Sequence, residues 1–209
     1  MSERDLRNQM CEYGASLFER GLTAGSSGNI SVRIGNEILI TPTNSSLGRL
    51  DSGRISKVRL DGEWISGDKP SKEAFLHLAM YGARASDTAI VHLHSTWSVA
   101  VSCLADIDPA NCLPPITAYF VMRVGRLPRV PYFPPGDRQL AKEIEHRAIE
   151  SKAILLANHG PIVSGKSLDD AVNAIEELEE TAKLFLILRG MPTQYLTPDQ
   201  CTELGKRFP

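Results

Sequence analysis

Two short turns constrain the fold of this chain more than any other feature. Gly35-Asn36 lies between two apolar or alternating runs within residues 30–41, and Asp61-Gly62 lies between two more within residues 58–65. Two-residue turns of this type are typical of β-hairpins, whose strands run antiparallel. These hairpins argue against a doubly wound parallel sheet and predict a sheet that is mixed or largely antiparallel.

Helical periodicity and single apolar runs account for most of the remaining chain. Two further strands are predicted at residues 89–94 and 153–157, and the proline-rich section 106–137 predicts loops and edge strands with few regular helices. The combination predicts an α/β layered domain in which a central mixed, largely antiparallel sheet is flanked by helices. The expected helices cover residues 6–17, with Gly21 as a cap, about 70–80, 95–105, 138–150 and 167–188, with Gly190 and Pro192 as the stop.

Length and composition predict one domain spanning residues 1–209. Hydrophobic residues make up 42% of the chain and charged residues 23%, the ordinary range for a globular protein, which argues against disorder. A chain of this length removes about 70% of its unfolded surface from water on folding, enough for one substantial core. No internal repeat or long Gly/Ser linker divides it.

The charge balance and the lengths of the apolar runs predict neither a nucleic-acid nor a membrane partner. The 23 Lys and Arg residues stand against 25 Asp and Glu residues, and no basic run is longer than a pair, whereas nucleic-acid binding needs clustered cations. The longest unbroken apolar stretches, 153–157 and 184–188, are far shorter than the roughly 18 residues that span a bilayer. Alternating charges at the N-terminus and four cysteines without a Cys-x-x-Cys pair predict a cytoplasmic protein.

The pair His92 and His94 is the sharpest chemical feature. In a strand, side chains two residues apart project from the same face, about 7 Å apart along the chain, so two imidazoles so placed can share one metal ion. A hydrogen-bonded pair in the core or an exposed pair at an edge is the alternative. Because Ile90 and Val91 bury this strand, two unpartnered imidazoles there would be costly, which favours a metal.

A metal site needs further donors, and two residues are candidates. His159 ends another apolar strand in a turn, where the alternative is a histidine that hydrogen-bonds nearby carbonyls. Glu73, expected in the first turn of a helix, could be a ligand or a general base, or could simply favour the helix dipole. His146 is interpreted as a solvated helix residue and His77 as a packed one, although Glu73 and His77 are spaced to ligate together.

Polar segments elsewhere predict anion binding. Backbone N–H groups at a helix start, together with a lysine, can form a phosphate site, and small hydroxyl and amide side chains add donors. Each segment alone is ordinary turn chemistry, but together with a metal they indicate a small phosphorylated substrate. The segments are Ser26-Ser-Gly-Asn29, Thr41-Pro-Thr-Asn44 and Ser71-Lys72.

These motifs, in this order, resemble the class II aldolase/adducin family over nearly the whole chain. That family includes L-fuculose-phosphate aldolase and L-ribulose-5-phosphate 4-epimerase, and the resemblance is carried by Ala24-Gly-Ser-Ser-Gly-Asn-Ile-Ser31, Ile40-Thr-Pro-Thr43, Ser71-Lys-Glu73, Val91-His-Leu-His94 and Asn158-His-Gly160. Within the family the chain is most similar to the 3-oxo-tetronate 4-phosphate decarboxylases. That similarity is carried by Thr41–Asn44, Leu113–Tyr119, Pro131–Asp137 and Glu176–Lys183.

The resemblance implies a zinc ion, or another divalent metal, held by His92, His94 and His159. It implies that Glu73 is an additional ligand that can leave the metal and act as the acid/base. It further implies a homotetramer with active sites between subunits, to which Tyr119 is contributed by a neighbour. The implied phosphate pocket consists of Ser27, Gly28, Asn29, Thr43, Asn44, Ser71 and Lys72.

The reaction implied is zinc-dependent decarboxylation of 3-oxo-tetronate 4-phosphate to dihydroxyacetone phosphate and carbon dioxide, through a metal-stabilised enediolate. A sugar-phosphate aldolase or epimerase would pass through a similar enediolate and is the alternative. Lys72 departs from the aldolase pattern, which typically has a second serine there, and its charge suits an additional carboxylate or the phosphate. A non-catalytic assembly module, like the adducin head domain, is a rival of another class and predicts lost metal ligands.

Overall fold

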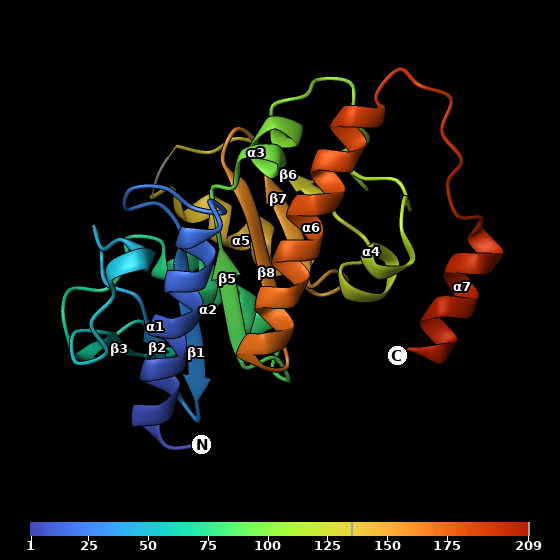
Figure 1. The fold of residues 1–209 in the computed structure, drawn as a ribbon. Helices are drawn as coiled ribbons and strands as arrows, with labels where there is room; N and C mark the ends of the chain where they lie inside the picture. The colour runs from blue at the N-terminus through green and yellow to red at the C-terminus, as the bar shows by residue number, and fades with distance from the viewer. Residues whose placement is uncertain (135, 209) are drawn as a thin grey trace.

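One eight-stranded sheet forms the centre of the computed structural model, which describes residues 1–134 and 136–208 (Figure 1). Pro135, within the predicted proline-rich section, and Pro209 lie outside the described residues. The strands are β1 (Asn29–Ile34), β2 (Glu37–Ile40), β3 (Ser56–Arg59), β4 (Trp64–Ser66), β5 (Ala89–His92), β6 (Arg129–Val130), β7 (Ala153–Leu156) and β8 (Gly160–Gly165). Their order across the sheet is β4-β3-β2-β1-β5-β8-β7-β6.

The strand pairing confirms a mixed, largely antiparallel sheet. Both predicted hairpins form, with β1 paired to β2 around Gly35-Asn36 and β3 paired to β4 around Asp61-Gly62. The central pairs, β1 with β5 and β5 with β8, are also antiparallel, whereas β6 runs parallel to β7. The β5 to β8 pairing is the one that builds the site, because it sets His92 opposite Ile162, three residues after His159.

Helices cover both faces of the sheet. They are α1 (Glu3–Glu19), α2 (Ala74–Ala83), α3 (Thr96–Ser102), α4 (Ala118–Arg123), α5 (Arg138–Ala148), α6 (Leu168–Leu188) and α7 (Pro198–Arg207), with a 3-10 turn at Leu47–Arg49. Figure 1 shows α1 and α6 in front of the sheet and α2 and α5 behind it. None of the helices within the described residues is long and apolar enough to cross a membrane.

Two hydrophobic cores lie on the two faces, so the central strands are buried on both sides. Val91 and Leu155 pack into the core beneath α1 and α6, while their neighbours Ile90 and Ile154 pack into the core beneath α2 and α5. Side chains alternate between the faces of a strand, and both faces are covered here. This explains why β5 and β7 are continuous apolar runs without polar alternation.

Two elements differ in their bounds from the sequence-based expectations. The helix expected from about residue 70 begins at Ala74, because Pro70 bridges Pro42 and the Ser71 N–H donates to the Thr41 carbonyl, which keeps this segment extended. Glu73 is therefore the N-cap residue of α2 and lies just outside the first turn. Strand β5 ends at His92, so His94 lies beyond it.

Two helices form where none was predicted. The short helix α4 occupies part of the proline-free stretch inside the proline-rich section, and its cap residue Thr117 accepts a hydrogen bond from the Phe120 N–H. The C-terminal helix α7 has a proline in its first turn and a capping box between Thr197 and Gln200. Those local signals could have found α7 in the sequence. It buries no residue and lies apart from the sheet at the end of an extended segment (Figure 1).

Candidate metal centre

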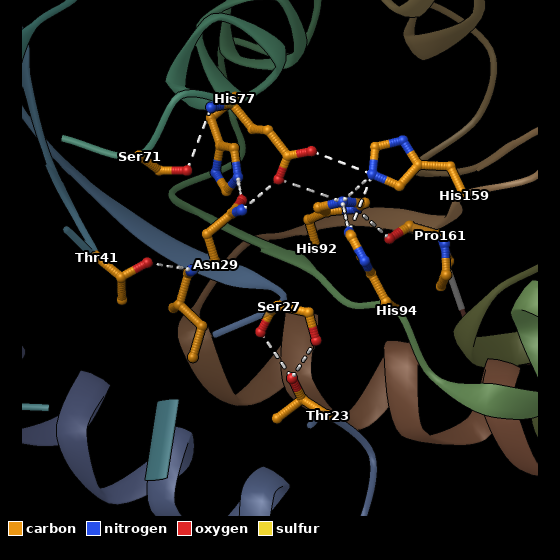
Figure 2. Close-up of polar contacts among 12 residues, drawn as sticks. Thr23, Ser27, Asn29, Thr41, Ser71, His77, His92, His94, His159 and Pro161 are labelled. Carbon is orange, nitrogen blue, oxygen red and sulfur yellow. Dashed lines mark hydrogen bonds and ion pairs between the residues drawn. The ribbon is translucent and has the colours of Figure 1, made fainter. Parts of the chain in front are cut away.

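Four side chains from distant parts of the chain converge at one end of the central strands. Glu73 caps α2, His92 ends β5, His94 follows it, and His159 lies in the turn between β7 and β8. Each offers one ligand atom, and these four atoms all lie within 4.8 Å of one another. Figure 2 shows the three imidazoles directed toward a common point, with a carboxylate beside them.

Five of the six distances among these atoms are close to those of a tetrahedral metal site. The Nε2 atom of His92 lies 3.1 Å from that of His94 and 3.3 Å from that of His159, and the last two lie 2.9 Å apart. The Glu73 carboxylate is 3.1 Å from His159 Nε2 and 3.6 Å from His92 Nε2. Four ligands placed tetrahedrally at 2.0–2.1 Å from one zinc ion lie about 3.3 Å apart. Three histidines and one carboxylate are also donors that zinc accepts.

The protonation states of the histidines suit ligation. His92 Nδ1–H donates to the Pro161 carbonyl at 2.8 Å, so its Nε2 carries the lone pair that faces the other ligands. Burial lowers the pKa of His92 to about 4, and burial also lowers the pKa of His94. Both imidazoles are therefore neutral at pH 7, which is the form that binds a metal.

The Glu73 carboxylate is held as an anion. Burial alone would raise its pKa, but adjacent His92 and hydrogen bonds from His159 and Asn29 hold the pKa well below its usual value. Asn29 Nδ2 donates to Glu73 Oε2 at 2.6 Å. The second oxygen, Oε1, faces His159. The anionic carboxylate and the three imidazoles together form a donor set of one oxygen and three nitrogens.

Two glycines allow the loops to close around the histidines. A Cβ atom at Gly160 would lie 2.3 Å from the Leu93 carbonyl oxygen, so only glycine lets the turn that carries His159 approach the segment that carries His94. Gly28 adopts a φ of +79°, and a Cβ there would lie 3.0 Å from the His92 carbonyl oxygen. The small-residue loop is therefore in direct contact with the backbone of the metal ligands.

A cavity of about 980 Å³ opens beside these residues. Glu73, His94 and His159 line it, while His92 lies behind them, fully buried. Lys72 is exposed at its wall and forms no ion pair with the described residues, and no other Lys or Arg of the described chain lines the cavity. The cavity wall includes all seven residues of the predicted phosphate pocket: Ser27, Gly28, Asn29, Thr43, Asn44, Ser71 and Lys72.

Several of these polar groups already have partners within the chain. The Ser27 hydroxyl donates to the Ala24 carbonyl at 2.7 Å, and Ser71 Oγ accepts from the Glu73 N–H at 3.2 Å. The Asn29 side chain lies between Glu73 and His77 (Figure 2). Lys72 is thus the group on this wall whose charge is free to meet an anion.

Two wall residues escaped the functional assignment made from sequence. Tyr132 and Phe133 line the cavity within the segment 131–137, which carried the resemblance but received no role. Tyr132 is 62% exposed, so its ring is available to a ligand. Two adjacent aromatic residues flanked by prolines are the sequence signal that could have identified this segment as part of the cavity wall.

The structure does not bring Tyr119 to the site of its own chain. It lies on α4, is 59% exposed, and does not line the cavity. The nearest notable partner is the Arg123 guanidinium, 5.9 Å from the ring centroid. Its assignment to a neighbouring subunit's site stays a prediction.

The remaining two histidines lie apart from the ligand cluster. His146 is exposed on α5, as interpreted from the charged sequence around it. His77 is fully buried on α2, in agreement with a packed helix residue, and hydrogen-bonds to Ser31 and Asn29.

Known proteins are similar to this chain in both sequence and fold. The family model described as "Class II Aldolase and Adducin N-terminal domain" matches residues 8–186. A 3-oxo-tetronate 4-phosphate decarboxylase of Escherichia coli K12 is 52% identical over 97% of this chain and 96% of its own length.

Solved structures agree. YgbL of Escherichia coli, described as an aldolase, epimerase or decarboxylase, superposes with a TM-score of 0.94 at 50% identity, covering 97% of this chain and 98% of its own. An L-fuculose 1-phosphate aldolase superposes with a TM-score of 0.87 at 27% identity, covering 98% of this chain and 96% of its own.

Proposed function

The chain belongs to the class II aldolase and adducin family, and from that premise we propose that it is a zinc-dependent decarboxylase of 3-oxo-tetronate 4-phosphate. One observation carries the proposal: a single cavity is lined by Glu73, His94 and His159, with His92 buried directly behind them, and by an exposed lysine without an ion pair among the described residues. The products are dihydroxyacetone phosphate and carbon dioxide.

The metal's part in the proposal follows from the donor set. His92, His94, His159 and Glu73 would hold the ion, and a bound divalent cation supplies Lewis-acid stabilisation of negative charge developing on adjacent oxygen atoms. Zinc is favoured over calcium or magnesium because imidazole nitrogen suits zinc and all-oxygen sites suit the other two.

The reaction breaks the bond between the carboxylate carbon and the hydroxyl-bearing carbon next to the ketone. As carbon dioxide leaves, the electron pair of that bond is delocalised onto the ketone oxygen, which gives an enediolate. A proton then adds to the carbon atom that carried the carboxylate. Glu73 is the carboxylate that lines the cavity, and no other Asp or Glu of the described chain does so. We assign proton handling to it.

The anionic ends of the substrate require positive charge that the chain supplies locally. The whole protein has a net charge of -2, but Lys72 lies at the cavity beside the N-terminus of α2, where backbone N–H groups favour an anion. Ser27, Gly28, Asn29, Thr43, Asn44 and Ser71 complete the proposed phosphate pocket. A substrate with both a phosphate and a carboxylate offers two anionic groups to the lysine, whereas a neutral sugar offers none.

The two rival functions predict different chemistry. An aldolase or epimerase would act on L-fuculose 1-phosphate or L-ribulose 5-phosphate. Neither of these substrates has a carboxylate that Lys72 could bind. A non-catalytic assembly module predicts lost ligands, whereas His92, His94, His159 and Glu73 are all present and converge. The ligand set therefore favours an enzyme, and the lysine favours the acid substrate.

We also propose a cytoplasmic homotetramer whose active sites lie between subunits, without nucleic-acid or membrane partners. Tyr119 is exposed and distant from its own cavity, as a residue that serves a neighbour's site would be. The mass of the protein in solution, measured by light scattering, tests the assembly. A monomer that is fully active would refute it.

A product assay tests the function. Purified protein loaded with zinc is incubated separately with each stereoisomer of 3-oxo-tetronate 4-phosphate, and carbon dioxide and dihydroxyacetone phosphate are measured. We expect the two products in equal amounts from one isomer, and none after chelation. L-Fuculose 1-phosphate and L-ribulose 5-phosphate serve as comparison substrates, and faster turnover of either one would favour the aldolase or epimerase alternative.

A further inference from the structure

A line of hydrogen bonds runs from the metal centre into the core behind α2. Glu73 Oε2 accepts from Asn29 Nδ2 at 2.6 Å, and Asn29 Oδ1 lies 2.5 Å from His77 Nε2. His77 Nδ1 lies 2.7 Å from Ser31 Oγ, which in turn lies 2.9 Å from the Tyr81 hydroxyl. Figure 2 shows the His77 ring directed at the Asn29 amide, on the side away from the three ligand histidines.

The charge of the Glu73 carboxylate fixes the direction of the hydrogen bonds from Glu73 as far as Ser31. An anionic Glu73 carboxylate can only accept, so the Asn29 amide nitrogen must face it and the Asn29 oxygen must face His77. His77 therefore carries its proton on Nε2 and donates it to Asn29. Nδ1 is then an acceptor, and the Ser31 hydroxyl donates to it.

His77 decides which way the Asn29 amide points. If the amide were reversed, its oxygen would lie against the Glu73 carboxylate and its nitrogen would lie against the Nε2–H of His77, which gives two unfavourable contacts. The cost is large because His77 is fully buried, away from bulk solvent. The imidazole thus favours one orientation of Asn29 and, through it, one position of Glu73.

We propose that His77 is a positioning residue for Glu73. By donating to Asn29, it holds the amide that binds Glu73 Oε2 and leaves Oε1 directed at His159, 3.1 Å away. The inference rests on the proposed function for the role of Glu73 at a metal. It also gives Asn29 a second task, because the other hydrogen of its amide remains available to a substrate in the cavity that it lines.

Two substitutions that differ by one methylene test the proposal. His77→Gln keeps an N–H group near the position of Nε2, whereas His77→Asn is too short to reach Asn29, and both place a neutral amide in the same buried site. Co²⁺ is the probe, because its visible spectrum reports the ligand geometry and its affinity can be measured by competition with a coloured chelator. Neither measurement needs a substrate.

We expect His77→Gln to keep the wild-type Co²⁺ spectrum and to bind Co²⁺ within about 3-fold of wild type, as expected when an outer-shell donor is retained. His77→Asn should alter the spectrum and weaken Co²⁺ binding about 10- to 100-fold. An unchanged spectrum and affinity in His77→Asn, or equal defects in both variants, would overturn the proposal.

Ser164→Ala is the matched control for general destabilisation. Its buried hydroxyl on β8 donates to Asp87 Oδ2 at 2.5 Å, away from the ligands, so its loss should lower the free energy of unfolding and leave the Co²⁺ spectrum unchanged. A Co²⁺ defect in Ser164→Ala equal to that of His77→Asn would show that stability alone is responsible, which also overturns the proposal.

A third variant covers the case in which neither His77 variant folds. Ser31→Ala removes the hydroxyl that holds the Nε2–H tautomer of His77, and a weaker change in the Co²⁺ spectrum in the same direction is expected. An unchanged spectrum there would count against the proposal. Wild-type protein that binds no Co²⁺ would refute the metal centre and this role together, whereas binding without decarboxylation refutes only the proposed substrate.

Discussion

Two walls of one cavity differ in how the chain holds them. At the candidate metal centre, His92 is fully buried and donates a hydrogen bond to the Pro161 carbonyl. Glu73 accepts a hydrogen bond from Asn29. On a second wall, which we call the anion wall and which consists of Thr43, Asn44, Ser71 and Lys72, the side chains are partly or fully exposed.

The difference separates what each wall contributes. The metal centre is part of the core, and Gly160 and Gly28 are required there because loops press against the ligand backbone. Changes at the metal centre should therefore affect stability and chemistry together. The anion wall presents one ammonium group near the N-terminus of α2, so under the proposed function we expect changes there to affect substrate binding and leave the fold intact.

The largest effect is expected from His92→Ala. The change removes a ligand and a buried hydrogen bond to Pro161, so the protein should lose its metal, and its rate should fall by about 10³-fold or more because the Lewis acid is absent. Metal analysis and the product assay measure the two losses. His146→Ala, an exposed histidine on α5, is the control and should retain both. Full metal content in His92→Ala would contradict the assignment.

Glu73→Gln should separate the ligand role from proton transfer. The amide keeps the size of the side chain but cannot take a proton, so we expect much of the metal to remain while turnover falls about 10²- to 10³-fold. Metal content per chain and kcat are measured on the same preparation. If the metal is lost as completely as in His92→Ala, then Glu73 is principally a ligand.

Lys72→Met should have a smaller effect, confined to substrate binding. Losing one charge-assisted contact should raise KM about 10-fold, and the free energy of unfolding should stay within about 0.5 kcal/mol of wild type because the residue is exposed and unpaired within the described chain. Lys142→Met, an exposed lysine on α5, is the matched control. Equal KM values in the two variants would show that Lys72 does not contact the substrate.

The antiparallel sheet and the pair His92 and His94 were predicted from local patterns, whereas Glu73 and His159 come from other parts of the chain and were assigned as ligands through the resemblance. Gly35-Asn36 and Asp61-Gly62 form hairpins as expected. The pair His92 and His94 converges for a reason different from strand alternation, since β5 ends at His92. Their Nε2 atoms lie 3.1 Å apart, so the two imidazoles converge as the spacing predicted, although the strand is shorter than predicted.

What the sequence could not predict depends on contacts between distant segments. The partners of His77 come from β1, 46 and 48 residues earlier, and no local pattern links them. In contrast, α7 was missed although its capping box and Pro198 are local signals, because its stretch has only two apolar residues, Cys201 and Leu204, too few to suggest a packed helix.

The smallest effect on stability at neutral pH is expected from the protonation of His77, which lies behind the candidate metal centre. It should appear as a loss of stability in acid. Burial lowers the pKa of His77 to about 3 in the folded protein, against about 6.5 in an unfolded chain. Between these values only the unfolded state takes up the proton, so this group's contribution is complete above about pH 6.5 and is lost as pH falls toward 3. The loss approaches 1.4 kcal/mol per pH unit.

His77→Gln should therefore reduce the number of protons taken up on unfolding, between about pH 6.5 and 3, by about one. Urea unfolding of the metal-free protein at pH 7, 6, 5 and 4 gives the slope of the free energy of unfolding against pH for each variant. The slope of His77→Gln should be shallower than that of wild type below pH 6, whatever its stability at pH 7. Ser164→Ala, which removes a buried hydrogen bond but no titrating group, should keep the wild-type slope. A slope in His77→Gln equal to that of wild type would mean that His77 takes up its proton in the folded state, and the fixed direction of the hydrogen bonds through Asn29 would then be lost at low pH.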